Sequence, residues 1–82
     1  MGQYADVKSK RMKKLLRWLQ RNKDIEVSKA GNHQIKVHCI HTGESYPLPI
    51  SHRTVNKYIV KNFMEWLVTR EVCSKEEFDS KI

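Results

Sequence analysis

Apolar and basic residues follow two separate stripes at helical spacing near the start of the chain. The apolar residues occupy positions i, i+3, i+4 and i+7 of one stripe: Met12, Leu15, Leu16 and Leu19. The basic residues of the opposite stripe keep a similar spacing: Lys10, Lys14, Arg17 and Arg21. Two separate stripes with a period near 3.6 residues are typical of an amphipathic helix. We therefore predict a helix from Ser9 to about Asn22, preceded by a polar segment, residues 1–8, that frays.

The period of the pattern changes to two residues after this helix, which is typical of half-buried strands. A first strand is predicted over residues 25–29 and a second over residues 33–41. One face of the second strand carries His33, Ile35, Val37, Cys39 and His41, and the other carries Gln34, Lys36, His38 and Ile40. Residues 30–32 and 42–44 contain Gly or Asn, which tolerate the positive φ of tight turns. These turns join the strands as antiparallel hairpins.

A third strand is predicted at the edge of the same sheet. Its inner face carries Tyr46, Leu48 and Ile50. Pro47 and Pro49 cannot donate hydrogen bonds to a strand ladder, and a strand with two such gaps is suited only to an edge. The three strands then form an antiparallel meander.

Two further helices are predicted in the second half of the chain. Ser51 is the expected N-cap of a long helix. The apolar stripe of this helix is wider and more aromatic than the first: Val55, Tyr58, Ile59, Phe63, Trp66 and Leu67. Trp66 is therefore expected in the core, whereas Trp18 lies at the margin of the first stripe. Residues 74–77, Ser-Lys-Glu-Glu, resemble a capping box that opens a short C-terminal helix.

These elements predict one domain over residues 1–82, because a chain of 82 residues holds one modest core. The expected fold is α+β with the order α-β-β-β-α, in which two helices pack on one face of a three-stranded antiparallel sheet, and a short extra C-terminal helix follows. The central part of the domain is expected over residues 9–70, with residues 1–8 and 71–82 as terminal extensions. This is the layout of the double-stranded-RNA-binding domain, although a shared layout does not fix a function.

The net charge of +7 is concentrated in the first part of the chain. Residues 1–36 contain ten Lys and Arg against three Asp and Glu, whereas residues 37–82 contain six of each sign. A clustered positive charge indicates a nucleic-acid-binding protein, although an acidic protein or a membrane surface would also be attracted. No acidic residue lies between Asp6 and Asp24, and an ordinary solvated helix usually mixes the two signs. The basic stripe is therefore predicted to bind the phosphates of RNA, and a merely solvated face is the alternative.

Disulfides, a membrane span, a metal site and a bound cofactor are not expected. Two cysteines are too few for a disulfide scaffold, so both are interpreted as reduced thiols of a cytoplasmic protein. No apolar run reaches the length of a membrane span, and no signal-peptide pattern is visible. His33, His38, Cys39 and His41 could ligate zinc, but strand alternation turns His38 away from the other three. His33 and His41 also lie roughly 20–27 Å apart along an extended strand.

His33 is the candidate for chemistry, because the turn at Gly31 and Asn32 delivers it to the first position of a strand. An imidazole titrates near neutral pH, so it can accept the proton of a ribose 2′-OH or donate one to a leaving 5′ oxygen. Such cleavage of RNA needs no metal, only proton transfer and a cation near the phosphate. Lys29 and Lys36 flank the turn and are the candidates for that cation. A surface histidine beside a hairpin is the alternative interpretation.

From the first helix to the long second helix, roughly residues 9–70, the chain resembles the HicA family of small bacterial toxins. The resemblance is carried by the Gly31-Asn32-His33 step, the proline-containing third strand and His52 before the long helix. It implies a double-stranded-RNA-binding-like fold and mRNA interferase activity. It also implies that His33 is the catalytic histidine, that Gly31 is the glycine of the family's Gly-Ser-His step, and that a cognate HicB-like antitoxin covers the active site.

The chain departs from the family's pattern in several places. Asn32 stands where the family has Ser, so an amide takes the place of a hydroxyl. Gln34 stands where the family often has a second histidine. The segment before the long helix is shorter and poorer in Gly and Lys than in the family, and residues 71–82 have no counterpart.

His52 is a second candidate for chemistry, because it lies at or just before the start of the long helix. A helix N-terminus attracts phosphate and disfavours a charged imidazolium. His52 is therefore interpreted either as an accessory group that positions a phosphate or transfers a proton, or as an exposed histidine with no role.

The residues predict RNA binding through the basic stripe and metal-independent cleavage with His33 as acid or base, and the resemblance to the HicA family implies that the protein is a small toxin acting on mRNA. A non-catalytic RNA-binding module of the same fold is the main alternative, and the departures at Asn32 and Gln34 favour it. A protein-interaction domain whose basic face meets an acidic partner is the third possibility.

Overall fold

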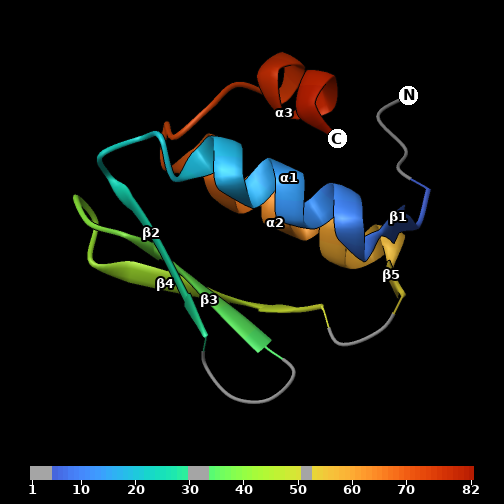
Figure 1. Cartoon of the computed structure of the whole chain (residues 1–82). Helices are drawn as coiled ribbons and strands as arrows, with labels where there is room; N and C mark the ends of the chain where they lie inside the picture. Colours follow the sequence, from blue (N-terminus) through green and yellow to red (C-terminus); the bar gives the residue numbers. More distant parts are fainter. Residues whose placement is uncertain (1–4, 30–33, 51–52) are drawn as a thin grey trace.

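A computed structural model gives the structure of residues 5–29, 34–50 and 53–82. The helices and strands are β1 (Val7–Lys8), α1 (Ser9–Leu19), β2 (Ile25–Lys29), β3 (Gln34–Cys39), β4 (Glu44–Pro49), β5 (Thr54–Val55), α2 (Lys57–Thr69) and α3 (Lys75–Lys81). Figure 1 shows α1 and α2 on the same side of the sheet formed by β2, β3 and β4, with α3 close to α1. The predicted α+β class, with helices covering one face of a three-stranded antiparallel sheet, is confirmed.

The three long strands lie in the order β2-β3-β4, and both neighbouring pairs are antiparallel. The register sets Val27 beside Val37 and Val37 beside Tyr46, so the residues predicted to face inward do form one row. β4 is an edge strand, as its two prolines predicted. The turn between β3 and β4 contains Gly43 with a φ of +73°, a conformation that glycine adopts without a steric penalty.

One hydrophobic core lies between this sheet and the helices. Its buried members are Met12, Leu15, Leu16, Leu19, Ile25, Val37, Cys39, Leu48, Val55, Val60, Phe63, Met64, Leu67, Cys73 and Phe78. The apolar stripe predicted for α1 is buried in full, which leaves the basic stripe on the outer side of the helix. Cys73 and Phe78 extend the core beyond residue 70, so α3 is packed into the same domain.

The apolar stripe predicted for α2 is wrong at Tyr58, which is 66% exposed. The buried residues of this helix follow i, i+3, i+4 and i+7 spacing: Val60, Phe63, Met64 and Leu67. Successive helical residues are rotated by about 100°, so Tyr58 lies about 200° from Val60 and faces away from the core. Trp66, expected in the core, lies half-buried with its ring centroid 6.3 Å from that of Phe63.

Two short strands, β1 and β5, form a second ladder that the sequence did not predict. Val7 pairs with Val55 and Lys8 with Thr54, so at least this end of the first eight residues is ordered rather than frayed. The N-cap of α2 is Asn56, not Ser51, because the helix begins only at Lys57. A two-residue strand has no periodicity, and its existence depends on a partner far away in the sequence.

The helix ends show one further difference and one confirmation. α1 ends at Leu19 rather than near Asn22, because the amide of Arg21 already donates to the Trp18 carbonyl three residues back, in a tighter turn. The predicted capping box at α3 is present: the Ser74 side chain accepts from the Glu77 amide, and the Glu77 side chain accepts from the Ser74 amide.

No helix in the described part of the chain has the length and apolar character needed to cross a membrane.

Candidate nucleic-acid interface

α1 presents an exposed row of cations on the side opposite its buried stripe. Lys10, Lys14, Arg17 and Arg21, which we call the basic face, are all exposed. The first three lie on the helix itself, and Arg21 lies in the turn directly after it. The apolar side of α1 is held in the core, so the helix cannot rotate this face away from solvent without unfolding. The predicted place of Lys10, Lys14 and Arg17 on the exposed side of the helix is confirmed, whereas Arg21 lies just after the helix rather than on it. The binding role of all four stays a prediction.

The charge of this face is not neutralised within the described structure. The ion pairs found among residues 5–29, 34–50 and 53–82 are His41–Asp24, Arg70–Glu44 and Lys75–Asp79, none of which involves α1. Arg11 and Lys13, which the predicted stripe omitted, are exposed as well and widen the positive surface. Their contribution could have been read from the sequence, because α1 contains five basic residues and no acidic one.

Lys29 and Lys36 lie near the same end of the sheet but on opposite faces. Lys29 is paired with Ile35, and Lys36 is paired with Ser28, one residue along each strand. Because side chains alternate along a strand, Lys29 lies on the face of Ile35 and Lys36 on the outer face. Both are exposed. A single phosphate on one face of the sheet would therefore meet one of these lysines rather than both.

Gly31, Asn32, His33 and His52 lie outside the described residues, so their predicted roles stay predictions. The described chain stops at Lys29 and resumes at Gln34 on the other side of this step. Among the described residues, Lys29 pairs with Ile35 and so shares its face, the face on which the sequence pattern predicts His33. If that prediction for His33 holds, Lys29 rather than Lys36 is the candidate for the cation on its face.

His38 lies in a row of polar residues on the outer face of the sheet, the face turned away from the helices. Glu26, His38 and Ser45 lie side by side on β2, β3 and β4. His38 Nδ1 lies 2.8 Å from Ser45 Oγ. In a catalytic triad an acid orients the imidazole through a hydrogen bond, but no such bond joins Glu26 to His38 in the described structure. We interpret this row as a cross-strand contact that stabilises the sheet.

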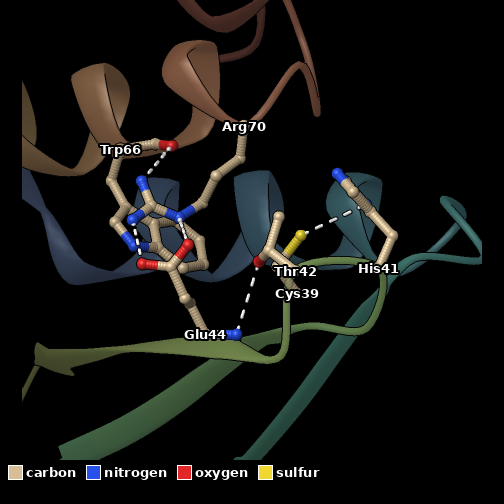
Figure 2. A network of polar contacts seen from close by, with 6 residues as sticks. All are labelled: Cys39, His41, Thr42, Glu44, Trp66 and Arg70. Carbon is tan, nitrogen blue, oxygen red and sulfur yellow. Dashed lines mark hydrogen bonds and ion pairs between the residues drawn. The ribbon is translucent and has the colours of Figure 1, made fainter.

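A second polar cluster fastens the β3–β4 hairpin to the end of α2, as Figure 2 shows. Arg70 donates from Nε and from a terminal nitrogen to the two oxygens of Glu44, at 3.1 and 2.5 Å. Its guanidinium carbon lies 4.7 Å from the ring centroid of Trp66. The hydrogen bond from Arg70 lowers the pKa of the Glu44 carboxyl below its usual value. This bidentate ion pair holds the hairpin against the end of α2, so we interpret the cluster as structural.

Cys39 and His41 are close enough to suggest a thiol nucleophile, but burial excludes that role. Cys39 Sγ lies 3.4 Å from His41 Nδ1, and Asp24 Oδ2 lies 3.6 Å from the same nitrogen. Cys39 is fully buried, so a substrate cannot reach its sulfur. Cys73 is also a buried free thiol, and burial raises its pKa to about 11. Both sulfurs therefore belong to the hydrophobic core.

No family model, curated protein or solved structure matches this chain. Within the described residues, no group of three His, Cys, Asp or Glu side chains is arranged to hold a metal ion.

Proposed function

We propose that this chain is an RNA-binding domain with a double-stranded-RNA-binding-like fold, and that it acts as a metal-independent mRNA interferase of the HicA type. The observation that carries the proposal is the basic face of α1, whose cations are exposed and have no acidic partner among the described residues. Binding of such a surface to a phosphate backbone is favourable, because its cations displace the counterions that surround the phosphates. Apart from the two-residue strands β1 and β5, the order α1-β2-β3-β4-α2 is the one expected for a double-stranded-RNA-binding-like fold. In that layout the first helix lies against RNA at a minor groove.

The cleavage step of the proposal uses His33. Its imidazole takes the proton of a ribose 2′-OH, and the resulting oxygen attacks the adjacent phosphorus. The bond from phosphorus to the 5′ oxygen breaks, that oxygen receives a proton from an imidazolium, and a 2′,3′-cyclic phosphate remains. Lys29 is the proposed cation for the charge that develops on the phosphate. Lys36 and His52 are proposed as accessory groups, and Gly31 and Asn32 as the turn that supports the site.

The proposal includes a protein partner. A toxin of this kind is held inactive by a cognate HicB-like antitoxin, and the basic face would attract an acidic surface on it. RNA and the antitoxin would then compete for the same side of α1.

Binding and cleavage are tested on the same purified protein in a buffer with a chelator. For binding, the affinity for a labelled RNA duplex is measured at rising salt concentration. We expect the triple variant Lys10→Gln, Lys14→Gln, Arg17→Gln to bind much more weakly, with a salt dependence shallower by about one unit of slope for each lost phosphate contact. The matched control removes three exposed cations elsewhere: Arg53→Gln, Lys57→Gln, Lys61→Gln. Equal losses in the two variants would contradict the assignment of the basic face.

For cleavage, we expect the wild-type protein to leave cyclic-phosphate ends on RNA. The variant His33→Ala is expected to bind RNA normally, to keep its circular dichroism spectrum and to cleave nothing. Cleavage by His33→Ala at the wild-type rate would remove His33 from the mechanism.

A non-catalytic RNA-binding module is the second candidate function. Asn32 in place of a serine, and Gln34 in place of a second histidine, favour it. RNA retention by the wild-type protein without any cleavage product would decide for this candidate.

A further inference from the structure

A pocket of about 270 Å³ lies between the end of α1 and the C-terminal part of the chain. It is lined by Trp18, Leu19, Arg21, Asn22, Val72 and Glu77. Sites for drug-sized molecules usually measure about 300–1,000 Å³, so this pocket suits a smaller group. One of its lining residues, Arg21, also belongs to the basic face, and the pocket therefore adjoins the surface on which RNA is proposed to bind.

Trp18 gives this pocket an aromatic wall beside the basic face. Its side chain is half-buried, at the margin of the buried stripe of α1. Lys14 precedes it by four residues, and residues three or four apart are neighbours on a helix surface. The Arg21 amide donates to the Trp18 carbonyl at 3.1 Å, which fixes Arg21 one turn further on. From α3, Lys81 Nζ lies 5.7 Å from the centroid of the Trp18 ring.

Charged side chains of both signs lie at or near the pocket. Arg21 and Lys81 are exposed, and neither is paired with an acid within the described residues. Glu77 is the acidic residue that lines the pocket, and its carboxylate accepts a hydrogen bond from the Ser74 amide at 3.0 Å. A phosphate next to Glu77 would be repelled by this carboxylate, whereas a phosphate near Arg21 and Lys81 would be attracted by both cations. The pocket therefore suits a planar neutral group whose anionic part stays outside.

We propose that this pocket binds one unpaired nucleotide of the RNA, with the base against Trp18 and its phosphate between Arg21 and Lys81. The proposal rests on the proposed function, since it places the RNA on the basic face. A paired base cannot leave its duplex to enter the pocket without a cost in stacking and pairing, whereas an unpaired base can stack on an aromatic ring. The pocket would thus direct the protein to places where a duplex adjoins a single strand.

The test compares a blunt RNA duplex with the same duplex carrying a single-stranded uridine tail. Both are titrated, with a chelator present, into protein that carries His33→Ala, so that no RNA is cut. We expect the tailed duplex to bind roughly tenfold more tightly, because stacking one base on an aromatic residue typically gives a change of this size. Trp18→Leu should remove the preference for the tailed duplex and leave the affinity for the blunt duplex unchanged. Trp18→Phe should keep most of this preference, and Lys81→Gln should weaken the preference.

The outcomes separate this inference from the function on which it rests. Equal binding of both duplexes by protein with Trp18 intact would overturn the pocket proposal and leave RNA binding by the basic face standing. A tail preference that survives Trp18→Leu would also overturn it. Failure to bind either RNA, together with tight binding of an acidic peptide, would overturn the proposed function itself.

Discussion

Arg70 joins α2 to the hairpin between β3 and β4 through several contacts at once. Its guanidinium lies over the ring of Trp66, two of its nitrogens bind the carboxylate of Glu44, and a third donates to the Trp66 carbonyl at 3.2 Å. The arginine side chain is only 18% exposed, so its charge is partly withdrawn from water. A planar guanidinium can stack and form a bidentate ion pair together, which a lysine at this position could not do.

The ion pair between Arg70 and Glu44 should make the stability of the fold depend on pH. The hydrogen bond from Arg70 lowers the pKa of Glu44 in the folded protein below 4.5, its value without such contacts. The contact therefore stabilises the fold above pH 4.5, and the stabilisation is lost as the pH falls through the lower folded-state pKa. We expect Glu44→Gln to unfold at a lower temperature than the wild type at pH 7, and the difference to shrink towards pH 3.

Thermal unfolding followed by circular dichroism at both pH values measures this effect. Glu65→Gln makes the same change of charge on the exposed side of α2, away from Arg70, and serves as the control. A difference between Glu44→Gln and the wild type that is the same at pH 3 as at pH 7 would show that the ionised carboxylate is not the source.

At the scale of single elements, the start of α2 depends on two side chains from different parts of the chain. The Asn56 side chain accepts from the Tyr58 amide at 2.8 Å, and the Asp6 carboxylate accepts from the Lys57 amide at 2.9 Å. Both satisfy amides that lack partners in the first turn of a helix. Asp6 reaches this position because β1 pairs with β5 directly before α2. The short ladder therefore also serves to cap a helix.

Loss of the N-cap should destabilise the protein measurably. Replacing an N-cap Asn by Ala typically costs about 1 kcal/mol, because one amide of the first turn loses its acceptor. We expect Asn56→Ala to lower the free energy of unfolding by about this amount in urea, and Asn56→Asp to preserve it. A wild-type midpoint for Asn56→Ala would indicate that Asp6 alone satisfies the helix start.

Elements whose signals are local could be predicted from the sequence, and those that depend on distant partners could not. The stripes of α1, the alternation in β3 and the capping box at Ser74 are each complete within a few residues. β1 and β5 consist of two residues each, and they exist because they pair across a long stretch of sequence, Val7 with Val55 and Lys8 with Thr54. The pocket at Trp18 was equally hidden, since α3 supplies two of its neighbours, Glu77 and Lys81.

At the scale of the whole molecule, α3 closes the core and places one cation, Lys81, near Trp18. Phe78 is fully buried and meets Phe63 edge to face, with ring centroids 6.2 Å apart. On the same short helix, Lys81 is exposed and lies over Trp18. One helix thus links the stability of the domain to the proposed nucleotide pocket.

A small domain has little stability to lose, so the docking of α3 should be essential. Stabilities of about 0.05–0.15 kcal/mol per residue are usual, which for a chain of this length gives roughly 4–12 kcal/mol. Truncation of a buried Phe to Ala costs about 3–5 kcal/mol through lost contacts and the cavity left behind. We therefore expect Phe78→Ala to lower the unfolding temperature by well over 10 °C, at roughly 4–8 °C per kcal/mol. Phe78→Leu, which keeps most of the volume, should lower it far less. If Phe78→Ala unfolded at the wild-type temperature in a single transition, α3 would not belong to the cooperative core. The pocket at Trp18, which requires α3 to be docked, could then not be a permanent feature of the protein.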